Sequence, residues 1–138
     1  MVGADLIEID RVRIAIKRTS RFCTRVFTPG EIEYCNSKAN PFPSFAVRFA
    51  AKEAFRKLHP AFTSGIKFQE VEVTNDPGGR PRYRLRGEAL ARVQELNIAR
   101  IDLSLSHSGN YALAVAVAIA GKEEGGDEDC NRRRNEEH

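Results

Sequence analysis

The sequence has no uninterrupted apolar run of the length that a membrane-spanning helix needs, which is about 18 residues or more. It also lacks the basic start and uncharged apolar run of a secretory signal peptide, because Asp5 falls in that region. Its three cysteines include no pair at C-x-x-C spacing and leave one odd, which disfavours a disulfide framework and a zinc site. We therefore expect a soluble, cytoplasmic protein without a membrane partner, and we assign no role to Cys23, Cys35 or Cys130.

The chain has 138 residues, 41% of them hydrophobic, which suffices for one core and is too little for two. Residues 1–120 hold 18 Lys and Arg against 12 Asp and Glu, whereas residues 121–138 hold 4 against 7. The last segment has no apolar residue besides Cys130, so we expect a folded domain over 1–120 and a disordered charged tail over 121–138. A basic body favours an acidic partner: a nucleic acid, a phosphorylated cofactor or an acidic protein.

Residues 44–58 predict the helix around which the rest of the chain is organised. Ser44 is a suitable N-cap, the interior is rich in alanine without Gly or Pro, and Pro60 stops the helix. One side is apolar and is expected to pack in the core, namely Val47, Ala51, Ala54, Phe55 and Leu58. Cations at i, i+4 spacing predict a basic stripe on another side, namely Arg48, Lys52 and Arg56. Glu53 lies between these sides.

The carboxylate of Glu53 allows two interpretations. With Lys57 one turn later it can form an exposed ion pair worth about 0.2–0.5 kcal/mol. Alternatively, a carboxylate partly removed from water beside an ammonium group suits a hard metal ion with a phosphate. Asp5 is a second carboxylate in an apolar setting, because residues 2–7 predict a strand with Gly3, Asp5 and Ile7 on one face. Asp5 is paired with a cation, caps the helix that follows or holds a metal.

Four further elements are predicted around this helix. A helix over residues 8–18 buries Ile9, Val12 and Ile16 and turns Arg11, Arg13 and Lys17 outward, where an acidic surface can dock. A capping box of Thr28, Pro29 and Glu31 begins a helix that ends about Asn36. Residues 66–73 and 80–87 predict a hairpin around the turn at 75–79.

The rest of the chain adds two groups of polar side chains. On the second hairpin strand, four arginines share one face and form either a solvated edge or an anion-binding rim: Arg80, Arg82, Arg84 and Arg86. A helix over 88–97, expected to bury Leu90, Val93 and Leu96, leads to strands at 101–106 and 111–120. The first of these strands ends in a group of polar side chains, the His–Ser strand end: Ser104, Ser106, His107 and Ser108. Either this group holds a phosphate or a substrate arm, or His107 has only a structural role. Together with the two carboxylates and Lys57, the strand end suits metal-assisted phosphoryl-type transfer.

The sequence resembles the bacterial holo-acyl-carrier-protein synthases, which move 4′-phosphopantetheine from coenzyme A to a serine of acyl carrier protein. The resemblance covers residues 2–119 and rests on five segments in the same order: GADLIEIDRV (3–12), FTPGEIEYC (27–35), RFAAKEAFRK (48–57), NDPGGRP (75–81) and LSLSHSGNYALA (103–114). It implies a small single α+β domain with an antiparallel sheet packed against helices. It also implies a homotrimer with active sites between subunits, and the strand YALAVAVAIA, apolar on both faces, is compatible with such an interface.

The resemblance also implies site residues. Asp5 and Glu53 match the residues that bind Mg²⁺, and Lys57 matches the lysine near the transferred phosphate. The implied catalytic residues are Glu53, Lys57 and His107, with either Glu53 or a water held by the metal as the base and with His107 orienting the coenzyme. The implied coenzyme-binding residues are Arg48, Lys57, Gly79, Arg80, Pro81, Ser106, His107 and Ser108. Arg11 matches the contact with the acidic carrier protein, and we add Arg13.

Two departures and two alternatives accompany the resemblance. The N-terminus is a few residues shorter before Asp5 than is common in the family, and the tail after Ala120 has no counterpart. One alternative is a non-catalytic module that binds nucleic acid through Arg80, Arg82, Arg84 and Arg86. Asp5 and Glu53 would have no role in such a module, since their carboxylates repel a phosphate backbone. We therefore expect no nucleic-acid partner. A related transferase that modifies carriers of polyketide or peptide synthesis is the other.

Overall fold

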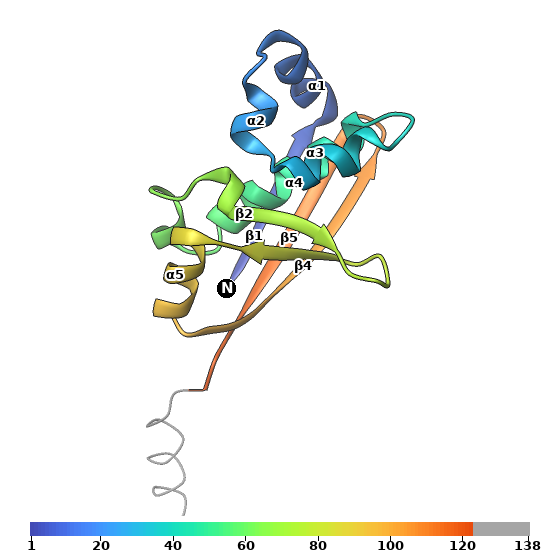
Figure 1. Cartoon of the computed structure of the whole chain (residues 1–138). Helices are drawn as coiled ribbons and strands as arrows, with labels where there is room; N and C mark the ends of the chain where they lie inside the picture. The colour runs from blue at the N-terminus through green and yellow to red at the C-terminus, as the bar shows by residue number, and fades with distance from the viewer. Residues whose placement is uncertain (123–138) are drawn as a thin grey trace, which may run out of the picture.

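A computed structural model describes residues 1–122 and shows the predicted α+β domain (Figure 1). The expected tail over 121–138 lies outside the described residues, apart from Gly121 and Lys122. The elements, in chain order, are β1 (Val2–Glu8), α1 (Ile9–Arg18), α2 (Phe22–Val26), α3 (Pro29–Asn36), α4 (Phe42–Arg56), η1 (Pro60–Phe62), η2 (Phe68–Glu70), β2 (Val71–Asn75), β3 (Pro81–Leu85), α5 (Gly87–Glu95), β4 (Ile98–Ser108) and β5 (Tyr111–Ala120). No helix within residues 1–122 is long and apolar enough to cross a membrane.

The main sheet is antiparallel and has the order β1-β5-β4, while β2 and β3 form a separate hairpin. Asp5 on β1 lies opposite Ala114 on β5, which in turn lies opposite Leu105 on β4. β1 and β4 are therefore opposite edges of one sheet. Helix α4 packs against β1 and β5, on the face where the even-numbered alanines of β5 are buried (Figure 1).

Helix α4 begins earlier than predicted. Its first residue is Phe42, its N-cap is Pro41, and the predicted N-cap Ser44 is a helical residue of the first turn. This start is possible because Pro43 lacks only an N–H that would have no partner within the first helical turn. The helix ends at Arg56, but Leu58 is still buried beyond it, so the predicted apolar side lies in the core as expected.

The predicted basic stripe on α4 is wrong as a surface feature. Arg48 and Lys52 are both buried, because α3 and β2 pack against α4. Arg56 is half-buried, with its guanidinium carbon 4.1 Å from the centre of the Phe68 ring. The cations have the predicted i, i+4 spacing, but this spacing does not show that α3 and β2 fold over the side of α4 that carries them.

Local turn and cap signals are confirmed. Thr28 Oγ1 accepts from the amide of Glu31, and Glu31 Oε1 accepts from the amide of Thr28 at 3.0 Å, so the capping box begins α3 as predicted. The hairpin turn closes where expected, with the amide of Gly79 bonded to the carbonyl of Asp76. Gly79 adopts a φ of +84°, a conformation that favours glycine.

Three further features of the elements differ from prediction. Only Val71–Asn75 forms the first hairpin strand, and Phe68–Glu70 is a 3₁₀ turn. The carbonyls of Phe68 and Val71 accept hydrogen bonds from the ammonium of Lys52. In α5, Ala89 faces the core and Leu90 is 40% exposed, because positions 89 and 90 fit the helical spacing to Val93 equally well. Strand β4 is longer than predicted and starts at Ile98.

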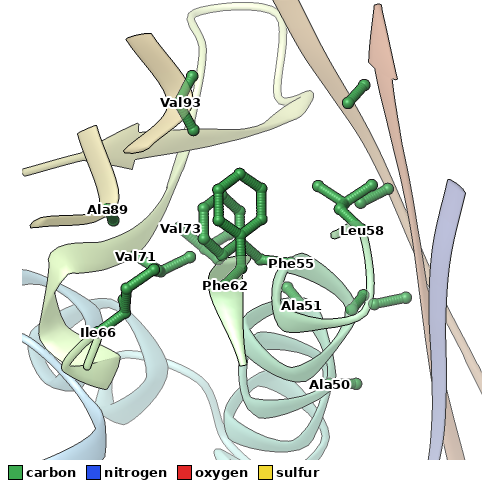
Figure 2. Packing of buried hydrophobic residues seen from close by; sticks show 14 residues of the cluster. Ala50, Ala51, Phe55, Leu58, Phe62, Ile66, Val71, Val73, Ala89 and Val93 are labelled. Carbon is green, nitrogen blue, oxygen red and sulfur yellow. The ribbon is translucent and has the colours of Figure 1, made fainter. Parts of the chain in front are cut away.

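Aromatic packing joins α4 to the hairpin and to α5. Figure 2 shows Phe55 and Phe62 stacked, with ring centres 4.6 Å apart. Val71 and Val73 of β2 and Val93 of α5 belong to the same buried cluster. This cluster fixes the C-terminal half of α4 relative to the rest of the domain.

The outer face of β1 and β5 is apolar and uncovered in the single chain. Val2 and Leu6 are 64% and 63% exposed. They lie opposite Val117 and Leu113 on β5, which point the same way and are also exposed. The strand at 111–120 is therefore apolar on both faces, as predicted, but α4 covers only one of them.

Candidate active site

Asp5 and Lys57 are joined by an ion pair between β1 and the end of α4. Lys57 Nζ donates to Asp5 Oδ1 at 2.8 Å, and the side chains of Lys57 and Asp5 are 54% and 15% exposed. The pair forms because β1 packs on α4, with Asp5 on the strand face turned toward the helix and Lys57 at the C-cap. A mostly covered carboxylate is therefore held by a cation that is open to solvent.

Glu53 lies one turn before Lys57 and is 27% exposed. Its Oε1 is 4.0 Å from Arg56 Nη1, the outer limit of an ion pair. The predicted Glu53–Lys57 pair is wrong, because Lys57 reaches Asp5 instead. The alternative that Asp5 caps the next helix is also wrong, since the N-cap of α1 is Glu8.

Asp5 and Glu53 place two carboxylates on adjoining elements, β1 and α4. Among residues 1–122, no group of at least three His, Cys, Asp or Glu side chains is close enough to hold a metal. Two carboxylates without further protein ligands suit Mg²⁺, which keeps several waters and takes its remaining oxygens from substrate phosphates. The donor set therefore fits the predicted metal.

Lys52 on α4 is buried in the contact of α4 with α3 and β2. Its ammonium donates to Glu31 Oε1 at 2.8 Å, and to the carbonyls of Phe68 and Val71 at 3.0 and 2.8 Å. Burial lowers the pKa of Lys52, and the negative charge of Glu31 opposes that shift. Three acceptors for three ammonium hydrogens indicate a structural role.

Arg48, one turn earlier on α4, is also buried but is not neutralised. Within the described residues, no carboxylate lies within ion-pair distance of its guanidinium and its Nε has no hydrogen-bond partner. One Nη donates to the carbonyl of Ser44 at 3.3 Å, and the guanidinium carbon lies 4.2 Å from the centre of the Tyr34 ring. A buried cation without an anion is costly, so this position suits a negatively charged ligand.

Tyr34 on α3 sits between two cations. Lys38 Nζ lies 4.8 Å from its ring centre, on a ring that also contacts Arg48. Partial burial raises the pKa of Tyr34, but the positive charges of Arg48 and Lys38, together with hydrogen bonds from Asn75 and Arg48, lower the pKa below its ordinary value. The cluster is therefore electropositive. Sequence reasoning assigned no role to Tyr34, and its position one turn after the capping-box glutamate was the only local signal.

The His–Ser strand end lies on the opposite edge of the sheet from Asp5. Ser106, His107 and Ser108 are exposed at the end of β4. The turn that follows is anchored on α1, because Asn110 accepts from the amide of Asp10 through its side chain at 3.1 Å. Its backbone carbonyl accepts from the amide of Ile9 at 2.7 Å. Asn110 is thus a helix cap that sequence reasoning missed.

A cavity of about 730 Å³ separates β3 from β4. Arg80 and Pro81 line it together with Ser104, whereas Gly79 and the strand end at 106–108 lie outside its lining. Within one chain, residues 1–122 show no hydrogen bond or ion pair that joins this side of the sheet to Asp5 or Lys57. The structure therefore brings Asp5, Glu53 and Lys57 onto adjoining elements, with Arg48 on the same helix as Glu53. The predicted coenzyme residues at 79–81 and 106–108 lie on separate elements.

The arginine face of β3 is exposed, as predicted, but part of it is neutralised. Arg82 pairs with Asp76 at 3.2 Å, and Arg86 pairs with Glu72 at 3.0 Å. The backbone amide of Arg80 and the side chain of Arg82 lower the pKa of Asp76. These pairs stabilise the hairpin and leave less charge for a nucleic acid than the sequence implies.

The predicted carrier surface lies on α1. Arg11 is exposed and lines a shallow hollow with Glu8 and Tyr111, while Arg13 is partly covered and pairs with Asp10 at 3.1 Å. Arg11 is therefore the freer of the two cations.

The cysteines within residues 1–122 are free thiols, with Cys35 buried and Cys23 partly buried. Burial raises the pKa of Cys35 to about 11 and also raises that of Cys23. Cys130 lies outside the described residues.

Comparison with known proteins places this arrangement in a family. A sequence profile of the 4′-phosphopantetheinyl transferase superfamily matches residues 1–116. The holo-[acyl-carrier-protein] synthase of Moorella thermoacetica is 43% identical over 124 residues, covering 90% of this chain and 97% of that one. The enzyme of the same name from Ruminiclostridium cellulolyticum is 46% identical over 127 residues, covering 88% and 92%.

Solved structures agree. A crystal structure of holo-[acyl-carrier-protein] synthase from Neisseria meningitidis has a TM-score of 0.71 at 32% identity, covering 85% of this chain and 95% of that one. A synthase described as a coenzyme A complex from Chronobacterium ammoniagenes has a TM-score of 0.74 at 32% identity, covering 88% and 97%. With the carboxylates on β1 and α4 in the segments that carried the resemblance, the chain belongs to the 4′-phosphopantetheinyl transferase superfamily, in the family of the holo-acyl-carrier-protein synthases.

Proposed function

We propose that this chain transfers the 4′-phosphopantetheine group of coenzyme A to a serine of an apo-acyl carrier protein, giving the holo carrier for fatty acid synthesis in the cytoplasm. The observation that carries the proposal is the contact of Asp5 with Lys57 across β1 and α4, one helical turn from Glu53. Two carboxylates and an ammonium group on adjoining elements suit a phosphate-bearing substrate. Coenzyme A in the described complex of the Chronobacterium ammoniagenes relative is consistent with this substrate.

Asp5 and Glu53 would hold Mg²⁺. When bound, the ion would act as a Lewis acid that offsets the charge growing on the 5′-phosphate of the leaving 3′,5′-ADP. In the free protein Lys57 keeps Asp5 in place by the 2.8 Å contact. Because the Lys57 side chain is half exposed, it can turn to a phosphate oxygen when the coenzyme arrives.

The carrier serine attacks the β-phosphorus of coenzyme A, its hydroxyl proton passes to a base, and 3′,5′-ADP leaves. Glu53 is the carboxylate on α4 that can accept this proton if it is within reach of the hydroxyl. Lys57 would stabilise the added charge on the transferred phosphate. His107 would orient the coenzyme from the end of β4.

Arg48 would bind a phosphate of the coenzyme. It is a buried guanidinium whose Nε lacks an acceptor within the described residues, so an anion would both neutralise its charge and complete its hydrogen bonding. The remaining coenzyme contacts would come from Gly79, Arg80 and Pro81, which lie beside the cavity between β3 and β4, and from Ser106, His107 and Ser108.

The proposed assembly is a homotrimer with active sites between subunits. Asp5 and His107 lie on opposite edges of the sheet in one chain, so contact between an edge of one subunit and the other edge of its neighbour would complete a site. The exposed apolar face of β1 and β5, which includes Val2, Leu6 and Val117, offers further surface for contact between subunits.

The direct test is transfer itself. The purified chain is mixed with an apo-acyl carrier protein, coenzyme A and Mg²⁺, and the mass gain of the carrier is followed by mass spectrometry. Asp5→Ala should reduce kcat/KM at least about 100-fold without unfolding the domain, because a metal ligand is lost. Full turnover by this variant, or turnover by the wild type in chelator, would contradict the metal assignment.

The carrier is expected to be acidic and to dock on α1. Arg11→Glu should raise the KM for the carrier about tenfold at low salt and leave kcat nearly unchanged, because repulsion replaces attraction at encounter. Lys122→Glu, an equal charge change at an exposed position after β5, is the control. Equal KM values for both variants would move the docking surface away from α1.

A further inference from the structure

Gly3 lies directly against the backbone of the last turn of α4. A Cβ added at this position would be 2.1 Å from the carbonyl oxygen of Ala54 and 3.0 Å from the amide nitrogen of Leu58. Both are backbone atoms that no rotamer change can move. At Gly30, by contrast, the nearest atom to an added Cβ is a side-chain oxygen at 3.6 Å, an ordinary contact.

The two elements that meet at Gly3 carry the proposed metal ligands. Asp5 follows two residues later and turns to the same side of β1, where Lys57 binds it at 2.8 Å. Glu53 and Ala54 are adjacent in α4, and the amide of Lys57 bonds to the carbonyls of both. Displacing β1 at Gly3 therefore displaces Asp5 from the helical turn that presents Glu53.

We propose that Gly3 is a positioning residue that sets the distance between Asp5 and Glu53, and that this distance selects Mg²⁺ over the larger Ca²⁺. The inference rests on the proposed function, in which these two carboxylates share one cation. The inference adds to that function a role for a glycine, which has no side chain, and a preference for a cation of one size.

The size of the displacement matches the difference between the two ions. An added Cβ at 2.1 Å must move beyond 3.0 Å, so the strand and the helix must separate by about 1 Å. Mg²⁺ binds oxygen at roughly 2.0–2.1 Å and Ca²⁺ at roughly 2.3–2.6 Å, so two carboxylates that share the ion sit about 0.4–1.2 Å farther apart around Ca²⁺. One methyl group at Gly3 is therefore enough to change the spacing of the two carboxylates from one that suits Mg²⁺ to one that suits Ca²⁺.

The test measures binding of each cation alone to the full chain, by calorimetry, in the presence of saturating coenzyme A. Gly3→Ala should raise the Kd for Mg²⁺ about tenfold or more and change the Kd for Ca²⁺ less than about threefold, because Mg²⁺ tolerates little distortion of its octahedron. Val93→Ala, which opens the core at α5 without touching β1, should leave the ratio of the two Kd values unchanged. Equal changes for both cations in Gly3→Ala would overturn the inference.

A longer carboxylate gives a second, independent arm. In the native spacing Asp5→Glu should raise the Kd for Mg²⁺ about tenfold, whereas in combination with Gly3→Ala it should recover most of the lost affinity by spanning the wider gap. If Gly3→Ala does not fold, the single variant Asp5→Glu tests the inference. A Kd of Asp5→Glu for Mg²⁺ within about threefold of the wild-type value would show that the spacing between the two carboxylates is not fixed, and would overturn the inference. If the wild type binds no Mg²⁺, the metal assignment of the proposed function fails, and this inference falls with it.

Discussion

Lys52 and Arg48 lie one turn apart on the same helix, carry the same charge and are 1% and 4% exposed, yet their surroundings are opposite. The ammonium of Lys52 has a carboxylate and two carbonyls as acceptors. Arg48 rests on the ring of Tyr34, and within residues 1–122 its charge meets no carboxylate. The first arrangement stabilises the fold, whereas the second leaves an unsatisfied charge that a ligand can satisfy. Burial of a cation alone therefore does not distinguish structure from function, and the identity of the counter-charge does.

The largest expected effect is on Lys52. Lys52→Met should lower the free energy of unfolding by about 3–5 kcal/mol, because it leaves the buried carboxylate of Glu31 without a cation. Urea denaturation followed by circular dichroism measures this loss. The double variant Lys52→Met with Glu31→Met should recover a large part of it, since an apolar pair can replace a buried ion pair. If Lys52→Met alone were as stable as the wild type, Lys52 would not be a structural cation and its contrast with Arg48 would not hold.

Arg48 should behave in the opposite way. Arg48→Met should change the free energy of unfolding by no more than about 1 kcal/mol, because the loss of the contact with Tyr34 is offset by removal of an unpaired buried charge. Its Kd for coenzyme A should rise about 10–100-fold, the worth of a charge-assisted hydrogen bond to phosphate. Calorimetric titration with coenzyme A measures the affinity. Unchanged affinity together with a large loss of stability would make Arg48 a second structural cation.

Sequence reasoning recovered the features that depend on neighbours in the chain. The capping box of Thr28 and Glu31 and the turn that ends at Gly79 formed as predicted, since their hydrogen bonds span only a few residues. The alternation that turned Gly3, Asp5 and Ile7 to one face was also correct. Asp5 was identified as a candidate ligand for the same reason: a strand with one buried face makes an inward carboxylate conspicuous.

The features that sequence reasoning missed depend on contacts between distant segments. Arg48 and Lys52 were assigned to a basic stripe along one side of α4, because helical spacing does not show which elements cover that side. It is covered by α3, which precedes α4 in the chain, and by β2, which follows α4 after two 3₁₀ turns. Lys57 was paired with Glu53 by helical spacing, whereas its partner is Asp5, 52 residues away. Helical periodicity defines the sides of a helix, but only the packed domain decides what covers each side.

The smallest expected effect is on the titration of Tyr34, and it reports the charge of Arg48 directly. Partial burial raises the pKa of Tyr34, but the positive charges of Arg48 and Lys38 and hydrogen bonds from Asn75 and Arg48 together lower it below its ordinary value of 10.0. Because the folded pKa is the lower one, ionisation of Tyr34 favours the fold, and its contribution to stability grows as the pH rises through that folded value toward 10.0. Arg48→Met should raise the pKa of Tyr34 and reduce this gain. Ultraviolet absorbance of phenolate against pH measures the shift, and Tyr34→Phe identifies which part of the signal belongs to this residue. If the titration of Tyr34 is the same in Arg48→Met and in the wild type, the guanidinium does not act on the ring, and the unsatisfied charge assigned to Arg48 is neutralised by another group.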